Sequence, residues 1–157
     1  MRMEEGAFAL LEAALHARRR DIDRIGDRIE ERRAAEVRGA EAIDSMGYQL
    51  HNLYGAFEQL FEEVARFFEN RVDDARYHAD LIRRMQLDIR GIRPALLSET
   101  TARDLDELRR FRHLFRHAYG TDLDSVRIAA LAAGVGGVRN AFARDLERFL
   151  SALRPGR

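Results

Sequence analysis

Residues 42–68 have the sequence AIDSMGYQLHNLYGAFEQLFEEVARFF, which contains the clearest hydrophobic pattern in the chain. Its apolar side chains recur every seven residues, at Ile43, Leu50, Phe57 and Val64. Other apolar and aromatic side chains fill the complementary positions: Met46, Leu53, Tyr54, Leu60, Phe61, Phe67 and Phe68. This pattern predicts one long helix over residues 40–70, with an apolar face wide enough to contact two neighbouring helices.

The segment before this helix predicts a second long helix, over residues 4–37. Its apolar residues are three, four or seven positions apart, and charged residues occupy the opposite face. The apolar set is Phe8, Leu11, Leu15, Ile22, Ile25 and Ile29. Because Gly39 interrupts the pattern, the two helices are expected to pair as a long antiparallel hairpin.

A shorter helix is expected next. Asp73 or Asp74 is placed to cap it, and its apolar positions continue through Ile89. Gly91 and Pro94 then end it, because neither residue suits a helix interior.

Ser98 is a good N-cap for the following helix, with Glu99 in its first turn. We expect this helix to run to Tyr119, where Gly120 is well placed as a left-handed stop.

The last part of the chain predicts helix again, starting at Asp124 or Ser125. The glycines within residues 134–137 are expected to loosen this segment, and a final helix then continues to Leu153. Taken together, these patterns predict an all-α fold: a four- to five-helix bundle in which residues 1–157 form a single domain.

The composition agrees with such a bundle. Hydrophobic residues make up 46% of the chain and charged residues 34%, with only two prolines in 157 residues. The absence of cysteine excludes disulfides and thiolate metal sites. No apolar run approaches the roughly 18 residues of a membrane span, and no signal peptide is recognised. We therefore expect a cytoplasmic protein without membrane contact.

The charges balance. The chain has 27 basic and 27 acidic residues, so no strong overall field attracts nucleic acid. All 27 of these basic residues are arginine, whose planar guanidinium suits phosphates and carboxylates.

Arg112 occupies an unusual position on the predicted helix over residues 98–119. On a helical wheel it projects inside the apolar arc, which consists of Leu105, Leu108, Phe111, Leu114, Phe115 and Ala118. A buried cation without a partner is costly, so this position requires a reason. The ordinary one is an arginine that extends to solvent or pairs with an acid on a neighbouring helix.

Residues 109–117 concentrate positive charge. They contain four arginines and two histidines but no acid. A local positive potential of this kind suits phosphate, although a solvated basic face is the usual explanation for such a run. The histidines add a further property, because an imidazole can give or take a proton near neutral pH.

A metal site is the other interpretation of His113 and His117, which are four residues apart and share a helix face. The zinc-protease motif with this spacing also contains a glutamate, which is missing here, and Arg116 would place a fixed positive charge beside the ion. We therefore expect no metal.

The other histidines, His16, His51 and His78, have no local partner, and packing at a surface or interface explains them best. Tyr54 and Glu58, one turn apart, are placed either to face a cleft or, for the tyrosine, to pack in the core.

Residues 112–119, Arg-His-Leu-Phe-Arg-His-Ala-Tyr, resemble the R-x4-H-x-Y signature of HepT-type toxins. These toxins belong to the HEPN superfamily of small helical ribonucleases. Gly120, which follows the tyrosine, also matches, and residues 83–95 and 101–108 are similar to bacterial HepT-like proteins. With the N-terminal hairpin, the resemblance spans nearly the whole chain.

The resemblance implies a metal-independent endoribonuclease without a cofactor, which acts as the toxin of a type VII-like toxin–antitoxin pair. The antitoxin would be an MNT-type nucleotidyltransferase. By position, Arg112 and His117 would be catalytic, His113 would assist, and Tyr119 would receive AMP from the antitoxin. The active cleft would form between two copies of the chain, as a homodimer. Among the arginines of residues 109–117, Arg109 and Arg116 are the candidates for RNA contact.

Helical spacing alone does not bring Arg112 and His117 together, because the two positions are about 140° apart on an ideal helix. Either the helix loosens before Gly120, or a cleft between two chains gathers residues from both. Two other functions stay open. One is a non-catalytic HEPN bundle that binds and regulates a partner nucleotidyltransferase. The other is a structural bundle whose arginines form ordinary ion pairs.

Overall fold

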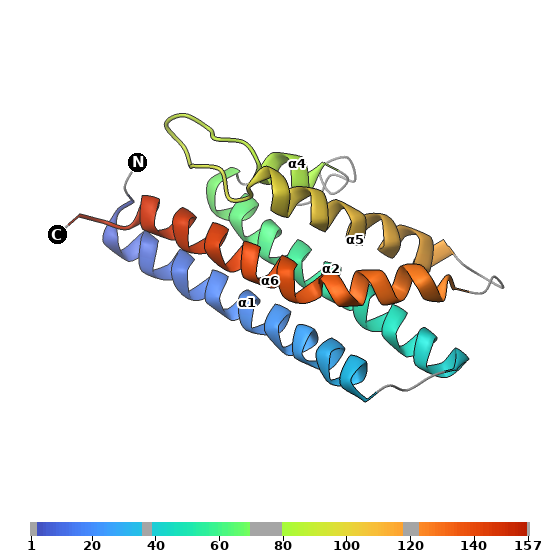
Figure 1. The fold of residues 1–157 in the computed structure, drawn as a ribbon. Helices are drawn as coiled ribbons and strands as arrows, with labels where there is room; N and C mark the ends of the chain where they lie inside the picture. The colour runs from blue at the N-terminus through green and yellow to red at the C-terminus, as the bar shows by residue number, and fades with distance from the viewer. Residues whose placement is uncertain (1–2, 36–38, 70–79, 118–122, 157) are drawn as a thin grey trace.

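A computed structural model of the protein describes residues 3–35, 39–69, 80–117 and 123–156 (Figure 1). The regular secondary structure in these ranges is helical. Five helices lie within these ranges: α1 (Glu5–Ala34), α2 (Ala40–Glu69), α4 (Leu81–Met85), α5 (Glu99–His117) and α6 (Ser125–Leu153). The same ranges contain no strand, only one isolated antiparallel bridge between Ile89 and Arg93. The predicted all-α bundle is therefore confirmed.

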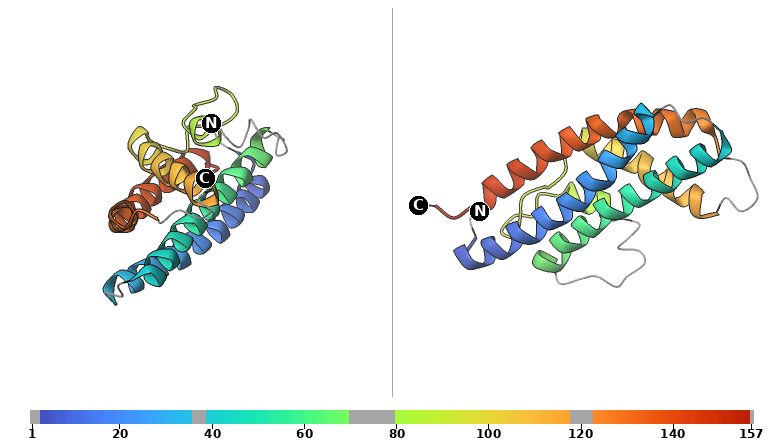
Figure 2. Two further views of the ribbon diagram at one scale, coloured as in Figure 1. Left: turned by 90° about the vertical axis from the view of Figure 1, so that its right-hand side faces the viewer. Right: turned by 90° about the horizontal axis from the view of Figure 1, so that it is seen from below.

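Helices α1 and α2 form the antiparallel hairpin that the sequence predicts, and they lie side by side in both sets of views (Figures 1 and 2). Glu4 caps α1 by accepting hydrogen bonds from the backbone N–H groups of Gly6 (3.0 Å) and Ala7 (3.1 Å), which lower the pKa of its carboxyl group. The predicted apolar face of α1 is buried against its neighbours, except that Ile25 is only half-buried.

Helix α2 lies at the centre of the molecule. It packs against α1, α4, α5 and α6, so its apolar surface serves two more neighbours than its sequence pattern predicts. Phe57 and Phe61 meet Phe142 of α6 at centroid distances of 5.1 Å and 6.3 Å, both edge to face. Such pairs add to the stabilisation that burial of the rings provides.

The start of α1 and the end of α6 are joined. The backbone N–H of Met3 donates to the carbonyl of Leu153 (3.0 Å), and Arg154 pairs with Glu12 (3.2 Å). The guanidinium of Arg154 also lies 5.7 Å from the centroid of the Phe8 ring. These contacts hold α6 against the first turns of α1.

Helix α4 is shorter than predicted, because it ends at Met85 and does not extend through Ile89. The carbonyl of Met85 accepts hydrogen bonds from the N–H groups of Leu96 (2.9 Å) and Leu97 (3.0 Å), where a longer helix would use the N–H of Ile89. The chain instead turns at Gly91, whose φ of 80° suits glycine. The expected caps, residues 73 and 74, lie outside the described residues.

The buried side chain of Arg93 fastens this turn. Its guanidinium donates to the carbonyls of Arg84 (3.0 Å), Leu87 (3.1 Å) and Pro94 (3.2 Å), and it pairs with Glu69 at the end of α2 (3.3 Å). A buried cation is tolerated when its terminal amino groups are paired in this way. The Arg84 carbonyl, which a longer α4 would have used, is therefore bound by this side chain.

Ser98 caps α5 as predicted, since its Oγ accepts a hydrogen bond from the N–H of Thr101 (3.4 Å). Asp145 of α6 is buried and accepts from the N–H (2.9 Å) and the hydroxyl (3.0 Å) of Ser98. Arg148 pairs with Asp145 (3.0 Å) and donates to the carbonyl of Leu96 (3.1 Å). The first turn of α5 is thus held in place by α6.

Helix α6 is one continuous helix, so the predicted loosening at residues 134–137 and the separate last helix are wrong. Asp124 caps α6 as predicted, by accepting from the N–H groups of Val126 (3.0 Å) and Arg127 (3.3 Å). Val135, which lies between the glycines, and Val138, which follows them, are buried. Their burial outweighs the helix penalty of the glycines, about 1 kcal/mol each.

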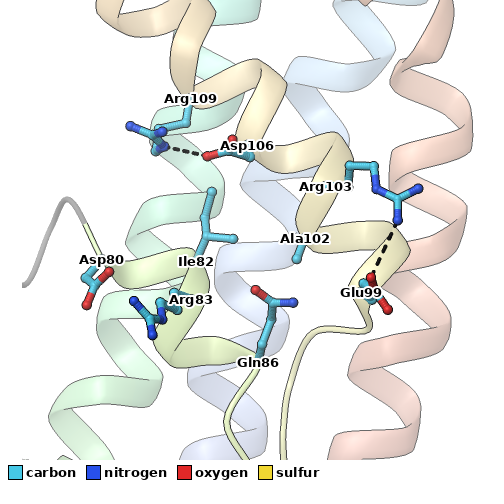
Figure 3. Close-up of a pocket in the computed structure, with 9 residues that line it drawn as sticks. All are labelled: Asp80, Ile82, Arg83, Gln86, Glu99, Ala102, Arg103, Asp106 and Arg109. Carbon is cyan, nitrogen blue, oxygen red and sulfur yellow. Dashed lines mark hydrogen bonds and ion pairs between the residues drawn. The ribbon is translucent and has the colours of Figure 1, made fainter.

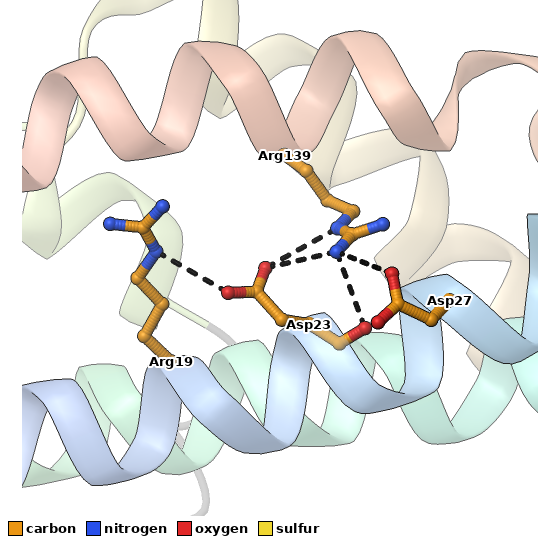
Figure 4. Close-up of polar contacts among 4 residues, drawn as sticks. All are labelled: Arg19, Asp23, Asp27 and Arg139. Carbon is orange, nitrogen blue, oxygen red and sulfur yellow. Dashed lines mark hydrogen bonds and ion pairs between the residues drawn. The ribbon is translucent and has the colours of Figure 1, made fainter.

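Arg139 of α6 reaches across to Asp23 and Asp27 of α1 (Figure 4). It passes through the gap that Gly26 leaves by having no side chain. Its guanidinium binds the carboxylates of Asp23 (3.2 Å) and Asp27 (3.0 Å) and the backbone carbonyl of Asp23 (3.3 Å). Arg19 approaches the other oxygen of Asp23 at 3.6 Å. A Cβ atom at position 26 would lie 2.6–2.8 Å from the Arg139 side chain, so the absence of a side chain at Gly26 is what admits it.

A membrane-spanning helix would have to be both long and strongly apolar, and none of the helices among the described residues meets this requirement.

Candidate functional site

The signature-like stretch lies at the C-terminal end of α5. Residues 112–117 belong to this helix, whereas Tyr119 and Gly120 lie outside the described residues. For His117 the structure describes the helical backbone and not the side chain. The site is therefore built from Arg112 and from the helix that faces it, α2.

Arg112 lies in the seam between α5 and α2. Its Nη1 atom is 3.3 Å from Oε1 of Glu58, and its guanidinium lies 5.8 Å from the centroid of the Tyr54 ring. Its side chain keeps 24% of its surface exposed. The ion pair with an acid on a neighbouring helix, which is the structural explanation for an arginine in an apolar arc, is therefore present. Five N–H donors on the guanidinium still allow a second, anionic partner.

The Tyr54 ring packs beneath this guanidinium. The ring is buried, and its hydroxyl has no hydrogen-bond partner among the described residues. Burial raises the pKa of Tyr54, as does the negative charge of Glu58. The phenol is therefore neutral at physiological pH, and the ring contacts Arg112 through its π face.

His51 belongs to this site, although sequence analysis placed it at a surface or interface without a partner. Its ring packs on Phe115 of α5 at a centroid distance of 5.2 Å. Burial lowers the pKa of the imidazole, and the positive charges of Arg112 and Arg116 lower it further. His51 is thus a neutral imidazole, and its Nδ1 atom is buried without a hydrogen-bond partner in the described part of the chain.

A sequence signal for His51 was present. His51, Tyr54 and Glu58 are three and four residues apart, which places all three on one face of α2. That face meets Arg112 and Phe115 of α5. The interpretation failed because the partners of His51 are distant in sequence.

The arginine run is partly neutralised. Asp106, one turn upstream, pairs with both Arg109 (2.8 Å) and Arg110 (3.0 Å). Arg116 is exposed and forms no ion pair with any described residue. His113 is also exposed. The positive potential that the run predicts is consequently concentrated towards the C-terminal end of α5 rather than spread along it.

Arg112 and His117 remain apart on the helix. Because α5 is helical through His117, the two positions diverge by about 140° around its axis. The helix therefore does not loosen between these two residues. No group of three or more His, Asp or Glu residues suited to a metal occurs among the described residues.

Comparison with known protein families identifies one family that matches this chain. The family described as "HepT-like protein" matches residues 45–153, from within α2 to the last residue of α6. The search of curated proteins and the search of solved structures returned no match. The match includes all of α5 and both sides of the seam that holds Arg112. The chain therefore belongs to the HepT-like protein family of the HEPN superfamily.

Proposed function

We propose that the protein is a metal-independent endoribonuclease and the toxin of a toxin–antitoxin pair. The observation that carries this proposal is the family match, which contains α5 with Arg112 and His117 at the five-residue separation of the HepT signature. The partly exposed guanidinium in the seam between α2 and α5 supports it, because a phosphate can approach that seam from solvent.

The proposed reaction is transesterification of RNA. The ribose 2′-oxygen attacks the adjacent phosphorus, the bond from phosphorus to the 5′-oxygen breaks, and a 2′,3′-cyclic phosphate and a 5′-hydroxyl end result. His117 accepts the proton of the 2′-hydroxyl, and His113, one turn away on the same helix face, assists by protonating the leaving 5′-oxygen. Arg112 stabilises the extra negative charge on the phosphate. Arg109 and Arg116 contact the RNA backbone.

The active site is proposed to form between two chains. Positions 112 and 117 point in different directions on the α5 helix of one chain, so a phosphate bound by both residues requires a second copy. A two-fold axis near the end of α5 would bring Arg112 of one protomer towards His117 of the other.

Regulation is proposed to act on Tyr119. An MNT-type nucleotidyltransferase, the antitoxin, would attach AMP to this hydroxyl. The added phosphate would repel RNA from the cleft, and the added nucleotide would occupy it.

Inducible expression tests the catalytic assignment. We expect growth arrest and RNA cleavage with the wild type, and neither with Arg112→Ala or His117→Ala. Arg110→Ala is the matched control, because Arg110 is an exposed arginine of the same run that has no proposed role. Arrest by the Arg112→Ala variant equal to that of the wild type would contradict the assignment.

Mass spectrometry after co-expression with the nucleotidyltransferase tests for AMP on Tyr119.

A second candidate function is a non-catalytic bundle that binds and regulates the nucleotidyltransferase. The ion pair between Arg112 and Glu58 favours it, since this arginine already has a carboxylate partner. A wild-type protein that binds the transferase but cleaves no RNA would support this function over the first.

A further inference from the structure

A pocket of about 430 Å³ lies between α4 and the first half of α5 (Figure 3). Its volume is within the range of small-molecule sites, roughly 300–1,000 Å³. Ile82 and Ala102 are buried and contribute its apolar part. Polar side chains complete the lining: Asp80, Arg83, Gln86, Glu99, Arg103, Asp106 and Arg109.

The pocket lies on the helix face that leads to His113. Its α5 residues Glu99, Ala102, Asp106 and Arg109 are three or four positions apart, and His113 is the next position in the series. The rise from Arg109 to His113 is about 6 Å along the axis. A nucleic-acid strand with its scissile phosphate near the end of α5 would therefore meet the pocket with a neighbouring nucleotide.

The charges of the pocket favour a base over a bare phosphate. Three arginines face three acids there, and two of these acids are already paired, Glu99 with Arg103 (3.6 Å) and Asp106 with Arg109 (2.8 Å). An anion would therefore meet carboxylates as well as guanidinium groups. A neutral base meets apolar surface, hydrogen-bonding groups and guanidinium planes on which it can stack.

Arg83 and Gln86 of the α4 segment are placed to make this contact specific. Both are exposed side chains that line the pocket, and Arg83 has no ion-pair partner in the described ranges. The amide of Gln86 has a donor and an acceptor for the edge of a base. The guanidinium of Arg83 can either stack on the base or donate two parallel hydrogen bonds to its phosphate.

We propose that the pocket between α4 and α5 binds one base of single-stranded RNA beside the scissile phosphate and thereby sets the cleavage preference. This inference rests on the ribonuclease function proposed above. It assigns sequence selection to α4 and the chemical step to the end of α5, so the two are separable by mutation.

Cleavage of a random-sequence RNA pool, followed by sequencing of the cut ends, tests the proposal. We expect a nucleotide preference at one position beside the cut for the wild type, and a flattened preference at that position for Gln86→Ala and Arg83→Ala. Arg90→Ala is the matched control, since Arg90 is exposed on the turn after α4 and does not line the pocket. A preference that both pocket variants leave unchanged would overturn the proposal.

A binding measurement separates failure of this proposal from failure of the ribonuclease function. In the Arg112→Ala background, fluorescence anisotropy with a labelled single-stranded RNA is expected to show about five- to tenfold weaker binding for Gln86→Ala or Arg83→Ala. Arg90→Ala in that background should bind like its parent. Equal affinity of all these variants refutes the pocket whether or not the wild type cleaves RNA, whereas weakened binding without wild-type cleavage refutes only the catalytic function.

Discussion

His51 occupies an environment that opposes its protonation. Burial and the nearby positive charges of Arg112 and Arg116 lower the pKa of its imidazole. We therefore expect its NMR titration midpoint to lie below the ordinary histidine value of about 6.5. Replacement of Arg116 by Ala should raise the midpoint, and replacement of Arg110 should leave it unchanged. A midpoint at or above the ordinary value would contradict the packing of His51 against α5.

The same shift gives a pH dependence of stability. The unfolded chain binds this proton more readily than the folded protein does, so the unfolding free energy rises with pH between the lowered pKa and about 6.5. The contribution is fully present above about pH 6.5 and is lost as the pH falls through the lowered pKa. In urea titrations, His51→Gln should reduce the dependence of stability on pH in that window.

Removal of the Asp145 side chain is expected to destabilise the contact between α6 and the start of α5. It is buried, and it accepts hydrogen bonds from the N–H and hydroxyl of Ser98 and from Arg148. Asp145→Ala should lower the unfolding free energy by about 2–4 kcal/mol, because the partly buried donors of Ser98 at the start of α5 lose their acceptor. Urea denaturation measures this effect. Glu147→Ala, on the exposed side of the same helix, should change stability by less than about 0.5 kcal/mol.

Within the site, the sequence predicted some properties of single residues and not others. The wheel position of Arg112 correctly indicated an arginine within an apolar face, because that property depends on local periodicity. Its partner Glu58 and the neighbour His51 depend on how α2 packs against α5, and local periodicity does not specify that packing. The spacing of His51 and Tyr54 was visible, but nothing in the sequence showed which helix they face.

At the scale of elements, the missing side chain at Gly26 lets Arg139 of α6 pair with α1, and this coupling can be tested by mutation. Glycine-to-alanine replacement in a helix normally stabilises by up to about 1 kcal/mol. In the wild type we expect Gly26→Ala to gain less than this or to destabilise, because the new methyl group displaces Arg139 from Asp23 and Asp27. In an Arg139→Ala background the full gain should return.

A double-mutant cycle in urea measures this coupling. Gly55→Ala is the control, because a Cβ atom at position 55 has no neighbour within 4 Å and the helical gain should appear in both backgrounds. Additive effects of Gly26→Ala and Arg139→Ala would show that the gap does not position the arginine.

Helix boundaries were predictable where a local cap decides them and not where tertiary contacts do. Ser98 and Asp124 cap their helices as expected, since capping involves residues two or three positions apart. The end of α4 was misplaced because Met85 bonds to the segment that returns beside it. The continuity of α6 through residues 134–137 was missed because helix propensity counts the glycines but not the burial of the neighbouring valines, Val135 and Val138.

For the whole molecule, complementation between inactive variants tests the shared active site. If Arg112 of one protomer acts with His117 of the other, a mixed dimer of Arg112→Ala and His117→Ala chains contains one intact site. Random mixing of equal amounts should then restore about a quarter of the wild-type activity, because half of the dimers are mixed and each has one of its two sites. Each variant alone is the control. No recovery in a verified mixed dimer would show that both residues act from the same chain.

The bond from Met3 to Leu153 has a consequence for the order in which the molecule opens. The amide proton of Met3 is protected from exchange with solvent deuterium only while the last turn of α6 stays closed, because its acceptor is the Leu153 carbonyl. Fraying at the C-terminal end of the bundle therefore becomes visible at the N-terminal end of the chain. The exchange rate of this one backbone proton at residue 3 therefore reports how often the last turn of α6 opens.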